Sequence, residues 1–438
     1  MKKIVSLVML VVLLALGVTA CKPTATEKPA EPETPKEAEK VSLRMWAHQN
    51  EAFNNGYQAL IDAYMEANPN VEITLETFEY DLYIQTLQTA MPAGEEADVM
   101  QLFGTWTSEY AERLLSVPED VMSVSGAKEA FYPSTLGGFI VDGKLYGLPQ
   151  ETNLEYGGVL VNKTLYEKAG LTYPPVWESM DNVLEDAKEL ATVEGDVMTV
   201  SGFHFASSDG AFFSFVAGIK QRGGDYWNAD QTGFTFDTPE AKAQLQWMVD
   251  AINVHGVSDP VLFEDAEGWV GDEFFQGRVG IGYIGTWMIA EGRAGYPDFA
   301  DEWDYLWLPP VVGSEHKFVA DSGWGLTVSP NSEHPNVAWD FAKFVTTNAD
   351  NARSWNIASG TIPAMPAVAK SPEIANEMPW VAKALDVLPG GEYLGNMPDR
   401  DLIVYEIVFP HILYALQGLE TVDEALQAMD NEANAAFE

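Results

Sequence analysis

Residues 41–78 read VSLRMWAHQNEAFNNGYQALIDAYMEANPNVEITLETF, and this stretch decides the fold. Apolar residues alternate over 41–45, which predicts a strand with one face in a core. The apolar spacing then changes to that of a helix over 53–65, and Asn68-Pro69 ends it. Alternation returns over 71–75, so the unit is strand, helix, strand.

The same alternation of elements continues downstream. A short helix is expected at about 82–90 and a strand at 97–103, which extends the pattern to β-α-β-α-β. This pattern is typical of a mostly parallel sheet covered by helices, an α/β fold. Further helices are predicted at about 178–191, from Thr238-Pro239 to Gly256, at about 335–347, and from the capping box Thr421-Val-Asp-Glu424 onward.

Length and composition limit the architecture and the class of partner. The chain has 438 residues, too many for one hydrophobic core and suitable for two domains. Apolar residues make up 47% and aromatic residues 12%, which indicates packed globular structure. The formal net charge is −42, and this excludes nucleic acid as a partner because phosphate contacts need a basic face.

The N-terminus has the features of a lipoprotein signal peptide, residues 1–20. Two lysines precede an apolar run, and Gly17-Val-Thr-Ala20 places small residues before Cys21, the only cysteine. We expect Cys21 to be acylated and to anchor the protein at the outer face of a membrane, since two or more acyl chains give stable binding. The alternative is an ordinary secretory signal beside a chance cysteine. Residues 21–40 are rich in Pro, Glu, Lys and Thr, which predicts a disordered linker.

No motif in the sequence specifies catalysis, a metal or a cofactor. Gly280-Ile-Gly-Tyr-Ile-Gly285 matches a dinucleotide fingerprint, but the segment resembles a strand and follows a helix end. Residues 138–144 begin like a P-loop, yet Leu145 stands where a magnesium-binding hydroxyl is needed. A single SxxK match at 125–128 lacks its companion motifs. The six histidines are dispersed, so we expect no zinc site. Because no catalytic motif is present in the sequence, we also expect that the protein is not an enzyme.

Four of the thirteen tryptophans stand out because they lie in glycine-rich or polar loops: Trp106, Trp227, Trp287 and Trp324. A flat apolar ring can stack on the C–H face of a sugar, while neighbouring amides and carboxylates bind the hydroxyls. Core packing is the alternative for each one, and it is the expected role of Trp177, Trp247 and Trp339 on amphipathic helices. As a set, the loop tryptophans favour a ligand cleft.

Several segments in fixed order resemble one family. They are GKLYGLP (143–149), VNK (161–163) with LYEKAG (165–170), PVWE (175–178), FQGRVGI (275–281), GTW (285–287), GWGLTVSPNSEHP (323–335), AWDFAKFV (338–345) and TVDEAL (421–426). The chain is similar to the extracellular solute-binding proteins of ABC importers, in the carbohydrate group that includes maltose-binding and glycerol-phosphate-binding proteins. Two positions depart from the family pattern, Val161 in place of tyrosine and Thr286 in place of proline.

The resemblance implies a two-lobed, type II periplasmic-binding-protein-like α/β fold with discontinuous domains, a hinge and a ligand between the lobes. It places an N-lobe at 41–150 plus 304–328 and a C-lobe at 151–303 plus 329–438. The ligand is then expected near the carboxyl ends of parallel strands.

The resemblance also implies a set of ligand-binding residues. Trp287 and Trp324 match aromatic ligand contacts of the family. The other contacts expected from the resemblance are His48, Asn50, Trp106, Asn153, Glu155, Asp209, Phe212 and Tyr405. Trp227 joins them from the set of loop tryptophans.

The predicted function is capture of a sugar outside the membrane and delivery to ABC permease subunits by a monomeric, lipid-anchored protein without a cofactor. One alternative is a secreted glycoside hydrolase with two carboxylates. Another is a binding protein for glycerol phosphate, a polyamine or a peptide. A phosphate ligand would need basic residues, of which Arg400 is a candidate, whereas carboxylates around aromatic rings would suit a polyamine.

Overall fold

The computed structural model describes residues 40–154, 157–205, 208–258, 270–286, 288–299 and 302–437. A five-stranded sheet forms one lobe, with the order β2-β1-β3-β14-β6. Its strands are β1 (Val41–His48), β2 (Val71–Phe78), β3 (Val99–Phe103), β6 (Leu148–Pro149) and β14 (Trp324–Val328). β1 runs parallel to β2 and β3, while β14 is antiparallel to β3 and β6. The predicted β-α-β-α-β unit is therefore confirmed.

Amphipathic helices cover the first sheet and complete its core. They are α1 (Glu51–Ala67), α2 (Tyr80–Ala93), α3 (Gly104–Glu109), α4 (Val124–Ala130), α5 (Pro133–Leu136), α12 (Pro335–Thr346) and α13 (Ala349–Ser359). Asn50 caps the N-terminus of α1, and its side-chain oxygen accepts a hydrogen bond from the N–H of Phe53 at 3.0 Å. Trp339 on α12 and Trp355 on α13 are fully buried in this core, as predicted for Trp339.

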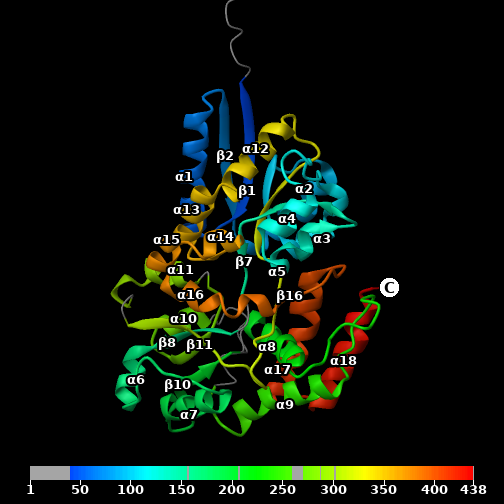
Figure 1. The fold of residues 1–438 in the computed structure, drawn as a ribbon. Coiled ribbons are helices and arrows are strands. Elements are labelled where there is room, and N and C mark those ends of the chain that lie inside the picture. The colour runs from blue at the N-terminus through cyan, green and yellow to red at the C-terminus, as the bar shows by residue number, and fades with distance from the viewer. Residues whose placement is uncertain are drawn as a thin grey trace, which may run out of the picture. The chain divides into compact units, whose positions relative to one another are not determined.

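A second five-stranded sheet has the order β12-β8-β11-β10-β9 and its own core. Figure 1 shows β8, β10 and β11 as a group separate from β1 and β2. The strands are β8 (Gly158–Asn162), β9 (Thr192–Glu194), β10 (Val197–His204), β11 (Val279–Tyr283) and β12 (Trp303–Trp307). β11 contains Gly280 and Gly282, two of the three glycines of the false dinucleotide motif, and is a buried strand, as predicted.

Helices of the second lobe surround this sheet. They are α6 (Lys163–Ala169), α7 (Met180–Leu190), α8 (Ser208–Gln221), α9 (Pro239–Asn253), α10 (Val270–Phe275), α11 (Met288–Gly295), α14 (Pro366–Ala369), α15 (Pro372–Glu377), α16 (Pro379–Ala384), a π-helix (Leu402–Val408), α17 (Phe409–Gln417) and α18 (Val422–Ala435). Thr421 and Glu424 form the predicted capping box of α18. No helix among the described residues is long and apolar enough to cross a bilayer.

Three short strand pairs lie outside the two large sheets. They are β4 (Ile140–Val141) with β5 (Lys144–Leu145), β7 (Glu151–Thr152) with β15 (Ile362–Pro363), and β13 (Phe318–Ala320) with β16 (Gly391–Tyr393). The segments β6–β7, β13–β14 and α13–β15 connect the two lobes, because each joins an element of one core to an element of the other.

One carboxyl group touches all three connecting segments. Glu151 lies on β7, and its Oε1 accepts a hydrogen bond from the N–H of Trp324 at 3.2 Å. Its side chain also bonds to Thr361, beside β15. Because the group is buried, its pKa is raised to about 7 despite these two hydrogen bonds.

The strand pairing differs from the predicted lobe boundaries at two places. β12, expected in the N-lobe from residue 304, pairs with β8 in the second sheet. α12 and α13, expected in the C-lobe, pack in the core of the first sheet. Sequence periodicity cannot show which of two sheets an apolar element joins, since either core would accept it.

Candidate functional site

Five aromatic side chains gather at the carboxyl ends of the parallel strands β1 and β3. This aromatic cluster consists of His48, Tyr80, Phe103, Trp106 and Trp324. His48 ends β1, Phe103 ends β3, Tyr80 begins α2 and Trp324 begins the neighbouring strand β14. The structure therefore brings three of the predicted ligand contacts, His48, Trp106 and Trp324, to the edge where open α/β sheets bind ligands.

Trp324 lies in the middle of the aromatic cluster with both ring faces covered. Phe103 stacks on it at 3.6 Å between ring centroids and 20°, and His48 stacks at 4.6 Å and 8°. No ring contact joins these two described residues, so they occupy opposite faces of the indole. Trp106 meets the Trp324 ring edge-on at 5.6 Å, and Trp324 is only 4% exposed. The expected free face at Trp324 is thus absent, and this indole supports its neighbours.

Tyr405 brings an aromatic ring of the second lobe toward this region. It lies on the π-helix, a geometry that often occurs at functional sites. The Arg400 guanidinium lies 4.6 Å from the centre of its ring. Arg400 also forms a buried ion pair with Asp321 at 2.5 Å and a second, partly exposed one with Asp401 at 2.8 Å.

Arg400 is electrostatically linked to both lobes. Burial alone would lower its pKa, but Asp321, Tyr405, Asp401 and Tyr80 raise it well above its ordinary value. Tyr80 belongs to the aromatic cluster, so Arg400 interacts electrostatically with the cluster as well as with Tyr405. Its charge is already neutralised by two carboxylates, which makes it a poor phosphate ligand.

The two predicted asparagines occupy structural positions near the cluster. Asn50 is 5% exposed and caps α1 two residues after His48. Asn153 is 6% exposed and follows β7. Its backbone lies against Gly323, where an added Cβ would come within 3.0 Å of the Asn153 nitrogen, so Asn153 borders a connecting segment.

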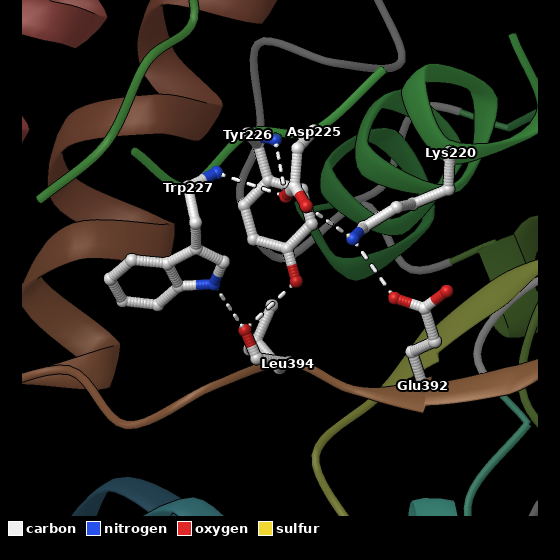
Figure 2. A network of polar contacts seen from close by, with 6 residues as sticks. All are labelled: Lys220, Asp225, Tyr226, Trp227, Glu392 and Leu394. Atoms are coloured by element: carbon white, nitrogen blue, oxygen red, sulfur yellow. Dashed lines mark hydrogen bonds and ion pairs between the residues drawn. The ribbon is translucent and has the colours of Figure 1, made fainter. Parts of the chain in front are cut away.

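Trp227, another predicted contact, lies in the core of the second lobe. Figure 2 shows its indole N–H and the Tyr226 hydroxyl both donating to the carbonyl of Leu394, each at 2.8 Å. Lys220 bridges Asp225 at 2.8 Å and Glu392 at 2.9 Å in the same network. These contacts hold the segment after β16 and give Trp227 a structural role.

Phe212 also lies in that core, 2% exposed and edge-on to Phe213. Trp287, Glu155 and Cys21 lie outside the described residues, and Asp209 falls on α8 with its side chain outside them. Predictions about these four side chains therefore stay predictions.

Acidic side chains of the two lobes face each other beside the cluster. Ser108 on α3 lies 3.4 Å from the hydroxyl of Tyr393 on β16, oxygen to oxygen. The next residue, Glu109, is partly desolvated and interacts with Asp399 and Asp401, and these effects raise its pKa to about 7.

A cavity of about 190 Å³ lies elsewhere, in the second lobe between α11, β12 and α16. Arg293, Trp303, Trp380 and Lys383 are among its lining residues. None of the predicted ligand contacts lines it. Within the described part of the chain, no group of three or more His, Cys, Asp or Glu side chains could hold a metal ion.

Sequence reasoning missed four residues that shape the region: Tyr80, Gln101, Phe103 and Asp321. Phe103 had a usable signal, because it ends a predicted strand directly before Gly104-Thr-Trp106. Gln101 and Asp321 had none, since a buried polar residue looks the same in sequence as an exposed one.

Comparison with known proteins supports the same reading of the fold. A maltose-bound MalE3 of T. maritima aligns with a TM-score of 0.74 at 21% identity, covering 90% of this chain and 99% of that one. A solute-binding protein of Thermotoga lettingae bound to α-D-tagatose aligns with a TM-score of 0.76 at 21% identity, covering 91% and 100%. The predicted two-lobed α/β fold is thus confirmed.

Proteins related in sequence lead to the same conclusion as the solved structures. The maltotriose-binding protein of Pyrococcus abyssi is 24% identical over 325 residues, 73% of this chain and 66% of the relative. An uncharacterized ABC transporter extracellular-binding protein of Pyrococcus horikoshii is 23% identical over 338 residues, 74% and 73%. The family model for bacterial extracellular solute-binding proteins matches residues 50–352. With two lobes, three connecting segments and this match over more than half its length, the chain belongs to the bacterial extracellular solute-binding proteins.

Proposed function

We propose that the protein is the substrate-binding component of an ABC importer and captures a mono- or oligosaccharide outside the membrane for delivery to the permease. The relatives above include proteins described with maltose, maltotriose and tagatose. The observation that carries the proposal is the aromatic cluster at the carboxyl ends of β1 and β3. His48 and Tyr80 are the partly exposed rings of the cluster and can meet the apolar face of a sugar, and polar groups at the strand ends suit its hydroxyls.

The mechanism is a shift between open and closed lobes. A ligand that contacts both lobes binds the closed state better and raises its population by that difference in affinity. Tyr405 and Arg400 from the second lobe and the aromatic cluster from the first would then close on one sugar. No catalysis is part of this function, and the protein acts as a monomer.

A thermal-shift screen followed by titration calorimetry tests the proposal. Maltose, maltotriose, D-tagatose and mannotriose represent the sugars, while spermidine, glycerol 3-phosphate and a short peptide represent the alternatives. We expect at least one sugar to raise the melting temperature and to bind reversibly without products. Binding of glycerol 3-phosphate or the peptide alone would contradict a sugar ligand, and release of shorter sugars would indicate a hydrolase.

A polyamine is the second candidate, favoured by the carboxylates of Glu109, Asp399 and Asp401 near the aromatic cluster. Spermidine binding that weakens in Glu109→Gln would support it.

Trp287 is proposed as the main stacking residue, on the family resemblance of its GTW segment. Loss of one central aromatic anchor costs about 2 kcal/mol or more, and each 1.4 kcal/mol is about tenfold in affinity. Trp287→Ala is therefore expected to weaken sugar binding roughly thirtyfold, measured by calorimetry, with an unchanged melting temperature. Normal binding by this variant would assign Trp287 to packing.

We also propose that Cys21 is acylated and tethers the protein to the membrane through the linker 22–40. Metabolic labelling with a fatty-acid probe should mark the wild type and leave Cys21→Ala unmarked. Equal labelling of both would contradict the anchor.

A further inference from the structure

His48 is held in one plane by the rings around it. Its imidazole is parallel to Trp324 at 4.6 Å, and Phe53 and Tyr80 meet it edge-on at 5.4 Å and 6.3 Å. His48 is partly exposed at the end of β1, whereas Trp324, against which its ring stacks, is buried. The outward imidazole, and not the indole, is therefore the ring of this stack that a ligand can reach.

Two contacts to one oxygen fix the tautomer of His48. The backbone N–H of His48 donates to Oε1 of Gln101 at 3.2 Å, which sets the orientation of that amide, because only its oxygen can accept. The same Oε1 lies 3.2 Å from Nδ1 of His48. Since an amide oxygen cannot donate, Nδ1 must carry the proton and Nε2 must carry the lone pair.

The surroundings keep this imidazole neutral. Burial lowers the pKa of His48 to about 4, and the hydrogen bond to Gln101 offsets only part of that effect. The side chains in ring or hydrogen-bond contact with this imidazole are Phe53, Tyr80, Trp324 and Gln101, and none of them is a carboxylate. No described residue is hydrogen-bonded to Nε2.

We propose that His48 presents Nε2 as a fixed hydrogen-bond acceptor for one hydroxyl of the bound sugar, with Gln101 as its positioning residue and Trp324 as its support. The inference rests on the proposed function and adds a rule of specificity to it. A sugar hydroxyl can donate to Nε2, but a hydrogen, a fluorine or a methoxy group at that position cannot. The site should therefore reject the analogue that lacks this one hydroxyl.

The tautomer can be measured without any ligand. Long-range ¹H–¹⁵N correlation spectra at pH 7 should show one of the six histidines with Nδ1 protonated and Nε2 unprotonated, and this signal should be missing in His48→Phe. Loss of Nε2 as acceptor would appear as an Nε2–H signal for His48 and would overturn the inference.

Binding then tests the role of Nε2, with maltotriose as the first probe and the sugar that gives the largest thermal shift if maltotriose gives none. His48→Phe keeps a flat ring on Trp324 and removes both nitrogens, so we expect at least tenfold weaker binding with little change in melting temperature. In the wild type, saturation should shift the Nε2 resonance. His334→Asn, at the N-terminus of α12 and outside the cluster, is the matched control and should bind like the wild type.

Gln101→Glu adds a readout that a structural role alone would not change. A carboxylate beside Nδ1 favours the imidazolium, in which Nε2 becomes a donor. Relative to the wild type measured at the same pH, binding by this variant should be weak at pH 6 and recover toward pH 8. Wild-type affinity in His48→Phe would contradict the inference alone, while failure of the wild type to bind any sugar would contradict the proposed function as well.

Discussion

At the scale of single residues, the covered faces of Trp324 determine what its removal should do. The indole is 4% exposed and is packed between His48 and Phe103. Trp324→Ala is therefore expected to cost about 3–5 kcal/mol of unfolding free energy, as for other buried tryptophans. Urea denaturation measures this, and Trp339→Ala, in the same core, should show a similar loss. A variant with wild-type stability would mean that Trp324 is free to meet a ligand.

The raised pKa of Glu151 predicts how the stability of the protein depends on pH. This pKa of about 7 in the folded protein lies above the ordinary value of 4.5. Between pH 4.5 and 7 the folded state therefore binds a proton that the unfolded state does not. The contribution of this group to stability is then complete below about pH 4.5 and is lost as the pH rises through about 7. Glu151→Gln keeps the neutral form and should melt higher than the wild type at pH 8, with little difference at pH 5.

Melting curves at pH 5, 6, 7 and 8 measure that difference. Glu66→Gln, an exposed change on α1, is the matched control and should shift the melting temperature equally at every pH. A Glu151→Gln difference that is also constant with pH would show that this carboxyl does not titrate between pH 5 and 8, which would contradict the prediction.

At the scale of elements, the network in Figure 2 makes Trp227 part of the scaffold. Trp227→Phe keeps a ring against Phe234 and removes the indole N–H that donates to Leu394. Because the Tyr226 hydroxyl still donates to the same carbonyl, the loss should be about 1 kcal/mol of unfolding free energy. Sugar affinity should stay within about twofold by calorimetry. Strongly weakened binding at wild-type stability would restore Trp227 as a ligand contact.

Elements were easier to predict than the site. Alternation at 41–45 and 71–75, the helix from Phe53, and the capping box at Thr421 are local signals, and each formed the expected element. The role of Trp227 could not be read, because a Gly-Gly-Asp-Tyr-Trp loop looks the same whether its indole faces a ligand or a distant carbonyl at Leu394. The covered ring faces of Trp324 could not be predicted for the same reason, since the rings that cover them come from strands far away in sequence.

At the scale of the whole molecule, the two lobes bring like charges together. Glu109 belongs to α3 of the first lobe, and Asp399 and Asp401 to the second. In the first lobe, Tyr110 and Arg113 lie close to Glu109. Opposite them, Arg400 is paired with Asp321 and Asp401. Burial, together with the charges of Asp399 and Asp401, raises the pKa of Glu109 to about 7. Protonation of Glu109 removes its repulsion with these two carboxylates, so it should favour closure as the pH falls from 8 to 6.

Small-angle scattering of the unliganded protein measures this closure. The radius of gyration of the wild type should decrease from pH 8 to pH 6, and Glu109→Gln should be compact at both values. Glu112→Gln removes the same charge three residues away and should behave like the wild type. A pH response that persists unchanged in Glu109→Gln would assign the effect to other groups.

The crossed chain path has a consequence for biosynthesis. β3 pairs with β14, and α12 and α13 fill the first core, yet residues 324–359 are translated only after every strand of the second sheet. At about 5–20 residues per second, the strands β1 to β3 would wait on the order of ten seconds or more beside an unpaired edge. The lobe that is made first is therefore finished last, and the nascent chain stays open to holding chaperones until residue 359 has left the ribosome.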